Sequence, residues 1–549
     1  MKNRWLSLLL CVLLVLSALT GCQNKKTEKD ILDDAADAAR ETMTLTMWLV
    51  TEEGTTPEAV GLVEEAINKI LKSKYKTRIE LSVFTEDEYY AALDAKLLAI
   101  GEYMNSDEYY DILEKEEEMA EEGITTEPEE TILNEWGIPE EKYPGVGKGQ
   151  LDIIFLSGND NYLKYSQSDD LAVLERLDDQ LKQGSKKLNS YIDPQFFTAY
   201  AANGGTYAIP NRHVIGEYAF LLTNRELVDK YFYDPDDLNT VAKCESFIQD
   251  VVKYEKDITP IKQLDYPLYT TYWSDNGERS LLSSIGNASM MESTYLAIKN
   301  TLTNSRFTDQ MRTLIGYQEK GYIAADPTTV DKFGMAVIKG GAELEAIYGE
   351  DYYMTVLEAP LASEEEMFEA MFGVTMYTKS LERSMEVITL LNTDPTIRNL
   401  LQYGIEGVHY QLTEDEGTVK RLNNDYMMDI VKTGNTFMAY PEEGQPADLW
   451  EYGKKQNLDV IISPFNGFSF YDSGLDEELM GRVAELSKTY FERLDACTTL
   501  ESLNAFLDAA KTELASNEDL KKALSTTEDG SPNMIYTDWY YTKYPPEDE

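Results

Sequence analysis

A strand–helix–strand pattern near the N-terminus restricts the fold more than any other part of the chain. Residues 44–50 and 78–84 are β-prone apolar runs, and the amphipathic segment Pro57–Lys72 lies between them. Two strands joined through a helix normally pair in parallel, with a right-handed crossover. A helix is predicted over 87–100, and the nearly continuous apolar run 151–156 is typical of a central parallel strand. The pattern therefore predicts an α/β fold.

Strand-like and helical stretches alternate further along, so we expect the chain to cross between two lobes more than once. Further extended segments are predicted at 205–211, 217–224, 333–338, 353–357 and 372–377, with helices dominating from Met385 onward. The expected division is an N-terminal lobe over 44–215, a first part of the C-terminal lobe over 216–332, a return to the N-terminal lobe over 333–377, and a second part of the C-terminal lobe with a C-terminal extension over 378–549. Within the N-terminal lobe, 101–149 is predicted to be an acidic surface insertion.

The first residues have the features of an export signal. Lys2 and Arg4 precede an apolar run to Leu19 that is too short to span a membrane comfortably, since a span needs about 20 residues. Leu19-Thr20-Gly21-Cys22 resembles the bacterial lipobox, which implies a signal peptide over 1–21, a lipidated Cys22 and a tether over 22–43. The expected location is the cell membrane, lipid-anchored and facing the extracytoplasmic side. An ordinary secretory signal with a chance cysteine is the alternative.

Charge and cysteine content exclude several classes of function. The chain has 49 Lys and Arg against 99 Asp and Glu, a net charge of −50, which makes nucleic acid an improbable partner. Beyond the signal and the lipid site, Cys244 and Cys497 remain; buried free thiols are favoured over a single disulfide. No metal-binding spacing and no cofactor motif is present.

The segment Tyr403-Gly404-Ile405-Glu406-Gly407-Val408-His409-Tyr410 resembles the Tyr-Gly-Ile-Glu-Gly-x-His-Tyr signature of extracellular solute-binding lipoproteins of carbohydrate ABC importers, specifically a family 1-like branch of aldouronate or oligosaccharide type. Segments 152–158, 205–211 and 467–470 agree with it. The resemblance implies a two-lobed periplasmic-binding-protein (Venus-flytrap) fold with an inter-lobe cleft and a helix-rich second lobe. It also implies a monomer that captures an oligosaccharide and delivers it to ABC permease subunits. The chain departs from the family at Lys339–Glu343, which lacks an expected Trp, and in the tail after Ser516.

A sugar presents apolar C–H faces and many hydroxyls, so its receptor needs aromatic planes together with amides and carboxylates. Such side chains are expected where strands end at the cleft, or in polar, turn-rich surroundings. The candidate ligand-binding residues are Trp48, Ser157, Asn159, Asn211, Glu217, Trp273, Tyr403 and Trp450. For each Trp, a packing role in the core is the alternative, and for Glu406 and His409 a structural role in their loop is slightly favoured.

Two other functions stay open. The chain has only two histidines, no nucleophilic-serine motif and no zinc-protease motif, so an enzyme is not expected. A secreted glycoside hydrolase with a carboxylate pair is the first alternative, and a peptide-binding receptor of the same fold is the second. The net charge favours a neutral or weakly charged oligosaccharide; an acidic one would need a local arginine, for which Arg212 and Arg279 are the candidates.

Overall fold

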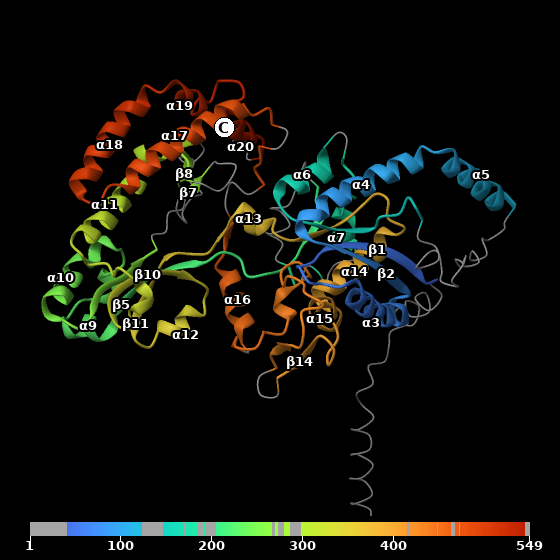
Figure 1. Cartoon of the computed structure of the whole chain (residues 1–549), viewed down its shortest axis with the longest axis horizontal. Helices are drawn as coiled ribbons and strands as arrows, with labels where there is room; N and C mark the ends of the chain where they lie inside the picture. Colours follow the sequence, from blue (N-terminus) through green and yellow to red (C-terminus); the bar gives the residue numbers. More distant parts are fainter. Residues whose placement is uncertain are drawn as a thin grey trace, which may run out of the picture.

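The computed structural model describes residues 41–122, 147–168, 171–183, 188, 191–192, 205–265, 270–272, 279–285, 298–413, 417–446, 448–462, 467–470 and 473–543. These residues form two α/β lobes and a helical module (Figure 1). The predicted signal peptide, Cys22 and Trp273 lie outside the described residues, as do most of the tether and half of the acidic insertion.

The first lobe is built on a five-stranded sheet of order β2-β1-β3-β13-β4. Its strands are β1 (Met43–Val50), β2 (Thr77–Phe84), β3 (Ile153–Leu156), β4 (Ala208–Pro210) and β13 (Met371–Val374). β1 pairs in parallel with β2 and β3, which confirms the predicted strand–helix–strand unit. β13 runs antiparallel to both of its neighbours, β3 and β4.

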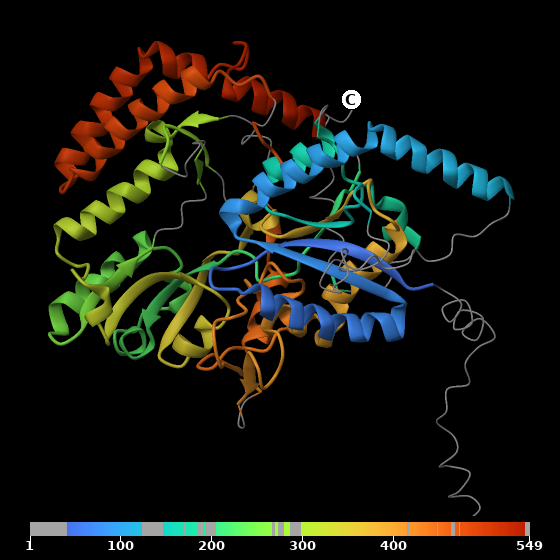
Figure 2. The ribbon, with the colours of Figure 1, turned by 45° about the vertical axis from the view of Figure 1, so that its right-hand side comes forward.

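Helices cover both faces of this sheet (Figure 2). They are α3 (Pro57–Tyr75), α4 (Glu86–Met104), α5 (Asp107–Glu122), α6 (Asn159–Gln167), α7 (Asp178–Gln183), α14 (Leu381–Thr393) and α15 (Pro395–Tyr403). In α3, the Thr56 side chain caps the first turn by accepting a hydrogen bond from the N–H of Ala59. Val63, Ile67 and Leu71 recur at helical spacing along its buried face, so local sequence determines both the start and the orientation of this helix.

The second lobe has a four-stranded sheet of order β11-β5-β10-β6. Its elements are β5 (Tyr218–Asn224), β6 (Thr259–Leu264), β10 (Phe333–Gly340), β11 (Tyr352–Glu358), α9 (Arg225–Lys230), α10 (Glu245–Tyr254) and α12 (Leu344–Tyr348), with short 3-10 helices at Pro235–Asp237, Ala242–Cys244 and Pro327–Thr329. Cys244 is fully buried in this lobe and Cys497 is buried in the helical module, and both are free. The predicted free thiols are therefore confirmed.

The helical module packs above the second lobe (Figure 1). It contains α11 (Ser305–Glu319), α17 (Glu477–Asp495), α18 (Leu500–Ala515), α19 (Glu518–Ala523), α20 (Pro532–Lys543), a 3-10 turn at Thr301–Thr303 and the small strands β7 (Thr270–Tyr272), β8 (Leu282–Ile285) and β9 (Lys299–Asn300). The tail after Ser516 supplies buried residues to its core, including Leu520 and Tyr536. The tail is therefore an integral part of the module.

The structure corrects two parts of the expected division of the chain between the two lobes. Residues 333–377 were expected to return to the N-terminal lobe, but β10 and β11 form ladders with β5 in the second sheet and only β13 joins the first. The segment after 378 was expected in the C-terminal lobe, yet α14 and α15 place Met385, Ile388 and Leu401 in the core of the first lobe. A strand-like or amphipathic pattern shows that a face is buried, and not which sheet buries it.

The chain segments that cross between the lobes, which we call crossings, contact one another. Residues 211–217 form the first crossing and 359–370 the second, where β12 (Leu361–Ala362) pairs in parallel with β16 (Ile461–Ile462). Gly216 has a φ of 66°, and a Cβ there would lie 2.8 Å from the backbone nitrogen of Leu361, so the two crossings approach too closely for a side chain.

One helix holds the first crossing from the side. Asn457 of α16 (Leu449–Leu458) donates to the carbonyl of His213 at 2.7 Å and accepts from the N–H of Ile215 at 3.0 Å. The remaining elements near this region are α13 (Glu364–Met367), β14 (Tyr410–Leu412), β15 (Val419–Arg421) and a 3-10 turn at Thr436–Met438. The crossings thus form one hydrogen-bonded unit between the lobes.

Candidate functional site

Each strand of the first sheet is connected to a loop at the same edge of the sheet. β1, β2, β3 and β4 all end there, and β13, which runs the other way, begins there. We call this the carboxyl edge and define it by residues 51–56, 85–86, 157–159, 211–213 and 368–370. Both crossings meet it, since the first follows β4 and the second leads into β13. In open α/β sheets ligands bind at this edge.

Two buried asparagines give the carboxyl edge unused acceptors. Asn159 donates from Nδ2 to the carbonyl of Phe468 at 3.1 Å, and Asn211 donates from Nδ2 to the carbonyl of Val431 at 2.9 Å. These two bonds fix which end of each amide carries the oxygen. In both residues that oxygen, Oδ1, is buried and accepts no hydrogen bond within the described part of the chain. A buried polar atom without a partner costs free energy. Both oxygens are therefore unused acceptors, which a ligand hydroxyl reaches only when the packing around the edge opens.

Ser157 and Trp48 lie near the same edge. The Tyr90 hydroxyl accepts from the N–H of Ser157 at 2.8 Å and donates to its carbonyl at 3.0 Å, which fixes the turn into α6. Burial raises the pKa of Tyr90 to about 12, so it stays a neutral hydroxyl. Trp48 is partly buried near the end of β1, with its ring centroid 4.7 Å from that of Phe84. The edge thus combines amides, a serine and an aromatic pair.

A histidine and a carboxylate lie where the first crossing leaves the edge. His213 is buried; its Nδ1 lies 3.0 Å from the carbonyl of Asn211 and its Nε2 lies 3.3 Å from a carboxylate oxygen of Glu369. Burial raises the pKa of Glu369, and the charges of Asp429 and Glu366 raise it further, against the opposing effects of His213 and Lys432. These groups can donate and accept hydrogen bonds at the start of the crossing. No group of three potential metal ligands occurs among the residues that the structure describes.

The second lobe places a buried ion pair at the end of β11. The Arg306 guanidinium lies 2.6 Å from Oε1 of Glu358, which is 6 % exposed. Burial raises the pKa of Glu358 to about 7, against the opposing effects of Arg306 and Lys339. Glu358 therefore binds a proton more tightly in the folded chain than in the unfolded chain.

Glu358 should make stability fall as pH rises. Its folded-state pKa of about 7 exceeds the ordinary value of 4.5, so the folded state is favoured below pH 4.5 and loses this advantage as pH rises toward 7. The full difference corresponds to about 3 kcal/mol. Chemical unfolding at pH 5 and pH 8 should show a loss in the wild type that shrinks by most of this amount in Glu358→Gln. An equal loss in both proteins would contradict the assignment.

Two of the predicted site residues make contacts within the fold. Tyr403 is fully buried, and its hydroxyl donates to the carbonyl of Tyr440 at 2.6 Å, so it offers no surface to a ligand in this conformation. Trp450 donates from Nε1 to the carbonyl of Ala439 at 2.7 Å and packs edge-on against Phe437. Glu217 is exposed on the first crossing.

The signature segment around Tyr403 forms a tight turn. Gly404 has a φ of 75°, and a Cβ there would lie 2.3 Å from Nδ1 of His409. That nitrogen accepts the N–H of Ile405 at 3.0 Å, and the ring stacks on Tyr426 with centroids 5.7 Å apart. Burial lowers the pKa of His409, so it stays neutral as an acceptor. These contacts support the structural role favoured for His409. Glu406, by contrast, is exposed.

The two candidate arginines are both engaged. Arg279 pairs with Asp495, with Nη1 and Oδ1 2.9 Å apart, in the helical module. The Arg212 guanidinium lies 4.8 Å from the ring centroid of Phe437. Both guanidinium groups therefore already have partners within the fold.

The helical module reaches the carboxyl edge at α6, which the sequence did not reveal. Besides the Asn159–Phe468 contact, the Ser469 hydroxyl donates to Asp160. The ring of Phe468 lies 5.2 Å from that of Trp539 on α20, and in both views α20 extends toward α6 (Figure 2). His213, Glu369 and Trp539 are thus residues of the site region that sequence reasoning missed. The only signal for Trp539 was the cluster of aromatic residues in the tail.

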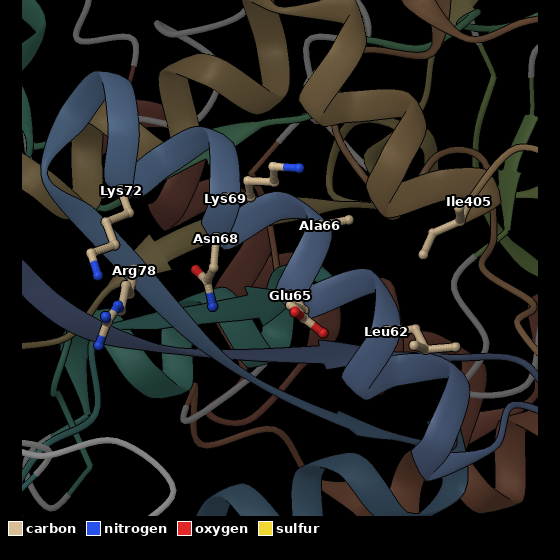
Figure 3. A pocket seen from close by; sticks show the side chains of 8 residues that line it. All are labelled: Leu62, Glu65, Ala66, Asn68, Lys69, Lys72, Arg78 and Ile405. Carbon is tan, nitrogen blue, oxygen red and sulfur yellow. The ribbon is translucent and has the colours of Figure 1, made fainter.

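Two open cavities lie elsewhere on the first lobe. One, of about 540 Å³, lies between α3, β2 and the turn after α15 (Figure 3). The other, of about 640 Å³, lies beside α4 and is lined by Leu97, Leu98 and Tyr377. Neither contains a predicted site residue. Among the described helices, none combines the length and apolar character needed to cross a bilayer.

Comparison with known proteins supports the fold and adds a related sequence. No family model matches the chain. A Streptococcus pneumoniae protein named carbohydrate ABC transporter substrate-binding protein is 25 % identical over 340 residues, which cover 58 % of this chain and 67 % of the relative.

The crystal structure of the N-glycan transport solute-binding protein NgtS from S. pneumoniae superimposes with a TM-score of 0.53 and 19 % identity, covering 92 % of this chain and all of that one. A Bifidobacterium longum infantis protein described as an HMO-binding, ABC-transporter-associated solute-binding protein gives a TM-score of 0.46 and 13 % identity over 91 % of this chain and 99 % of that one. The fold is that of a two-lobed solute-binding protein.

Proposed function

We propose that this chain is an extracytoplasmic solute-binding protein that captures an oligosaccharide at the carboxyl edge and delivers it to an ABC permease. The observation that carries the proposal is the pair of buried amide oxygens, on Asn159 and Asn211, at an edge bounded by both crossings. Sugar hydroxyls satisfy such acceptors, and partly buried aromatic rings such as Trp48 suit the apolar faces of a sugar. The related protein named for carbohydrate import supports the same function.

Binding without chemical turnover distinguishes this proposal from the hydrolase alternative. The raised pKa of Glu369, close to the charge of Asp429, is a property that a general acid also has. The chain should therefore be incubated with a panel of neutral oligosaccharides, matched uronate-bearing ones and short peptides, recording both melting temperature and released products. We expect stabilisation by neutral oligosaccharides with no product. Product release would favour the hydrolase, and stabilisation by peptides alone would favour a peptide receptor.

Within this function we assign the chain to the aldouronate or oligosaccharide-type branch of these lipoproteins, on the signature Tyr403–Tyr410. Its body is expected to act as a monomer at the outer face of the cell membrane. The permease subunits are its expected protein partners.

The anchor proposal makes Cys22 the lipidated N-terminus of the mature protein. Cys22→Ala should release the protein into the medium or stall its processing, because the acyl chains hold it at the membrane. Cell fractionation and the mass of the mature N-terminus measure this, with Cys11→Ala as the matched control that keeps the junction intact. Normal maturation and membrane fractionation of Cys22→Ala would contradict the anchor.

A further inference from the structure

The cavity beside α3 is lined by basic, apolar and polar side chains (Figure 3): Lys69, Lys72, Arg78, Leu62, Ala66, Ile405, Asn68 and the carboxylate of Glu65. Lys69 and Lys72 project from the exposed side of α3, and neither forms an ion pair with any other described residue. Lysine in the last turn of a helix is favoured by the helix dipole, which accounts for Lys72 but not for Lys69.

An apolar strip on the same helix forms part of the lining of this cavity. Leu62 is 46 % exposed, and Ala66 and Ile405 beside it are partly exposed. Leu62, Ala66 and Lys69 recur at helical spacing on the outer side of α3, where the exposed carboxylate of Glu65 also lines the cavity beside three basic side chains, Lys69, Lys72 and Arg78. An acidic amphipathic segment complements such a surface.

We propose that the acidic part of the N-terminal tether, residues 28–39, docks in this cavity. The segment Glu28-Lys29-Asp30-Ile31-Leu32-Asp33-Asp34-Ala35-Ala36-Asp37 places two apolar residues between clusters of carboxylates. Ile31 and Leu32 match the apolar strip, and Asp33, Asp34 and Asp37 match the lysines. The interaction is independent of ligand binding at the carboxyl edge.

The tether enters the fold beside this cavity. The N–H of Met43 donates to the carbonyl of Lys76 at 3.1 Å, and Thr44 lies opposite Arg78, which lines the cavity. From the end of α3 back to Leu62 the helix spans about 20 Å, and the dozen or so residues between Ile31 and Met43 span about 18 Å as a helix or about 40 Å when extended. An extended tether lets Ile31 reach Leu62, whereas a fully helical one is about 2 Å shorter than the span.

Covalent attachment favours the tether over other anionic partners. A segment joined by a short linker is present at an effective concentration on the order of millimolar, so even a weak site is filled. A bilayer with anionic lipids, by contrast, has to approach a body whose net charge is −50. Docking would hold the outer side of the first lobe toward the membrane and leave the carboxyl edge clear of it.

Disulfide trapping in the full-length lipidated chain tests the proposal. Ile31→Cys is combined with Leu62→Cys, and in the control with Leu98→Cys, which is 66 % exposed on α4 at the other cavity. Cys244 and Cys497 are buried and should not compete. We expect the Ile31–Leu62 pair to cross-link at least ten times faster than the control pair.

Charge reversal identifies what drives docking. Lys69→Glu with Lys72→Glu should slow the cross-link severalfold, and Asp33→Lys with Asp34→Lys in the same chain should restore it. Equal rates in the two cysteine pairs, or a rate unaffected by charge reversal, would overturn the proposal. So would a charge reversal that reduced binding to phosphatidylglycerol vesicles and left the cross-link unchanged, since the bilayer would then be the occupant. Oligosaccharide affinity should stay the same throughout.

Discussion

Replacing Asp152 by alanine is expected to lower the free energy of unfolding by about 3 to 5 kcal/mol. Its carboxylate is fully buried at the edge of the first sheet opposite the carboxyl edge. One oxygen accepts from the N–H of Thr46 at 2.8 Å and from Gln150 at 2.6 Å. The other accepts from the N–H of Lys379 at 2.6 Å and from the hydroxyl of Thr378 at 2.7 Å. Alanine would remove the shared acceptor of this network and leave the buried N–H of Thr46 without its partner, whereas Gln150 would keep its bond to the carbonyl of Thr44 at 3.0 Å.

Denaturant unfolding of the two proteins measures this loss. The matched control is Glu451→Ala, whose exposed carboxylate pairs with Lys454 at 2.7 Å and should contribute no more than about 1 kcal/mol. Oligosaccharide affinity should be unchanged in Asp152→Ala, because Asp152 lies at the opposite edge. A loss no larger than that of the control would show that the network does not stabilise the sheet.

The double variant Asn159→Ala with Asn211→Ala is expected to lose about 100-fold or more in oligosaccharide affinity. Each alanine removes a buried acceptor that the ligand would fill, and each such hydrogen bond is worth about 1 to 3 kcal/mol. Both side chains also donate to backbone carbonyls, so a lower melting temperature of the unliganded protein is expected as well.

Calorimetric titration at a temperature where each variant is folded separates these two effects. Trp450→Phe serves as the comparison, because the indole N–H of Trp450 is already bonded to Ala439 and its loss should affect stability alone. Unchanged affinity in the asparagine double variant would move the ligand site away from the carboxyl edge.

Local sequence was sufficient for the strand–helix–strand unit of the first lobe. The cap at Thr56, the periodic apolar face of α3 and the apolar runs around it predicted the strand–helix–strand unit. The rule that ligands bind where parallel strands end placed Asn159 and Asn211 at one edge, and the structure brings them there.

Contacts between residues far apart in the sequence could not be predicted from local sequence patterns. β10 has the alternating and apolar character of many strands, and only its ladders with β5 and β6 assign it to the second sheet. Trp450 lies in polar sequence, yet the carbonyl of Ala439 and the ring of Phe437 hold it in place. The contact between Asn159 and Phe468 joins residues far apart in the chain, so neither local pattern could reveal it.

Small-angle scattering at saturating oligosaccharide tests capture between the lobes most directly. A ligand that binds the closed form more tightly shifts the chain toward it, by rotation about the crossings fastened at Gly216 and Asn457. We predict a smaller radius of gyration in the liganded wild type and no change in Asn159→Ala with Asn211→Ala at the same ligand concentration. Saturable binding to the wild type with an unchanged radius of gyration would contradict capture between the lobes.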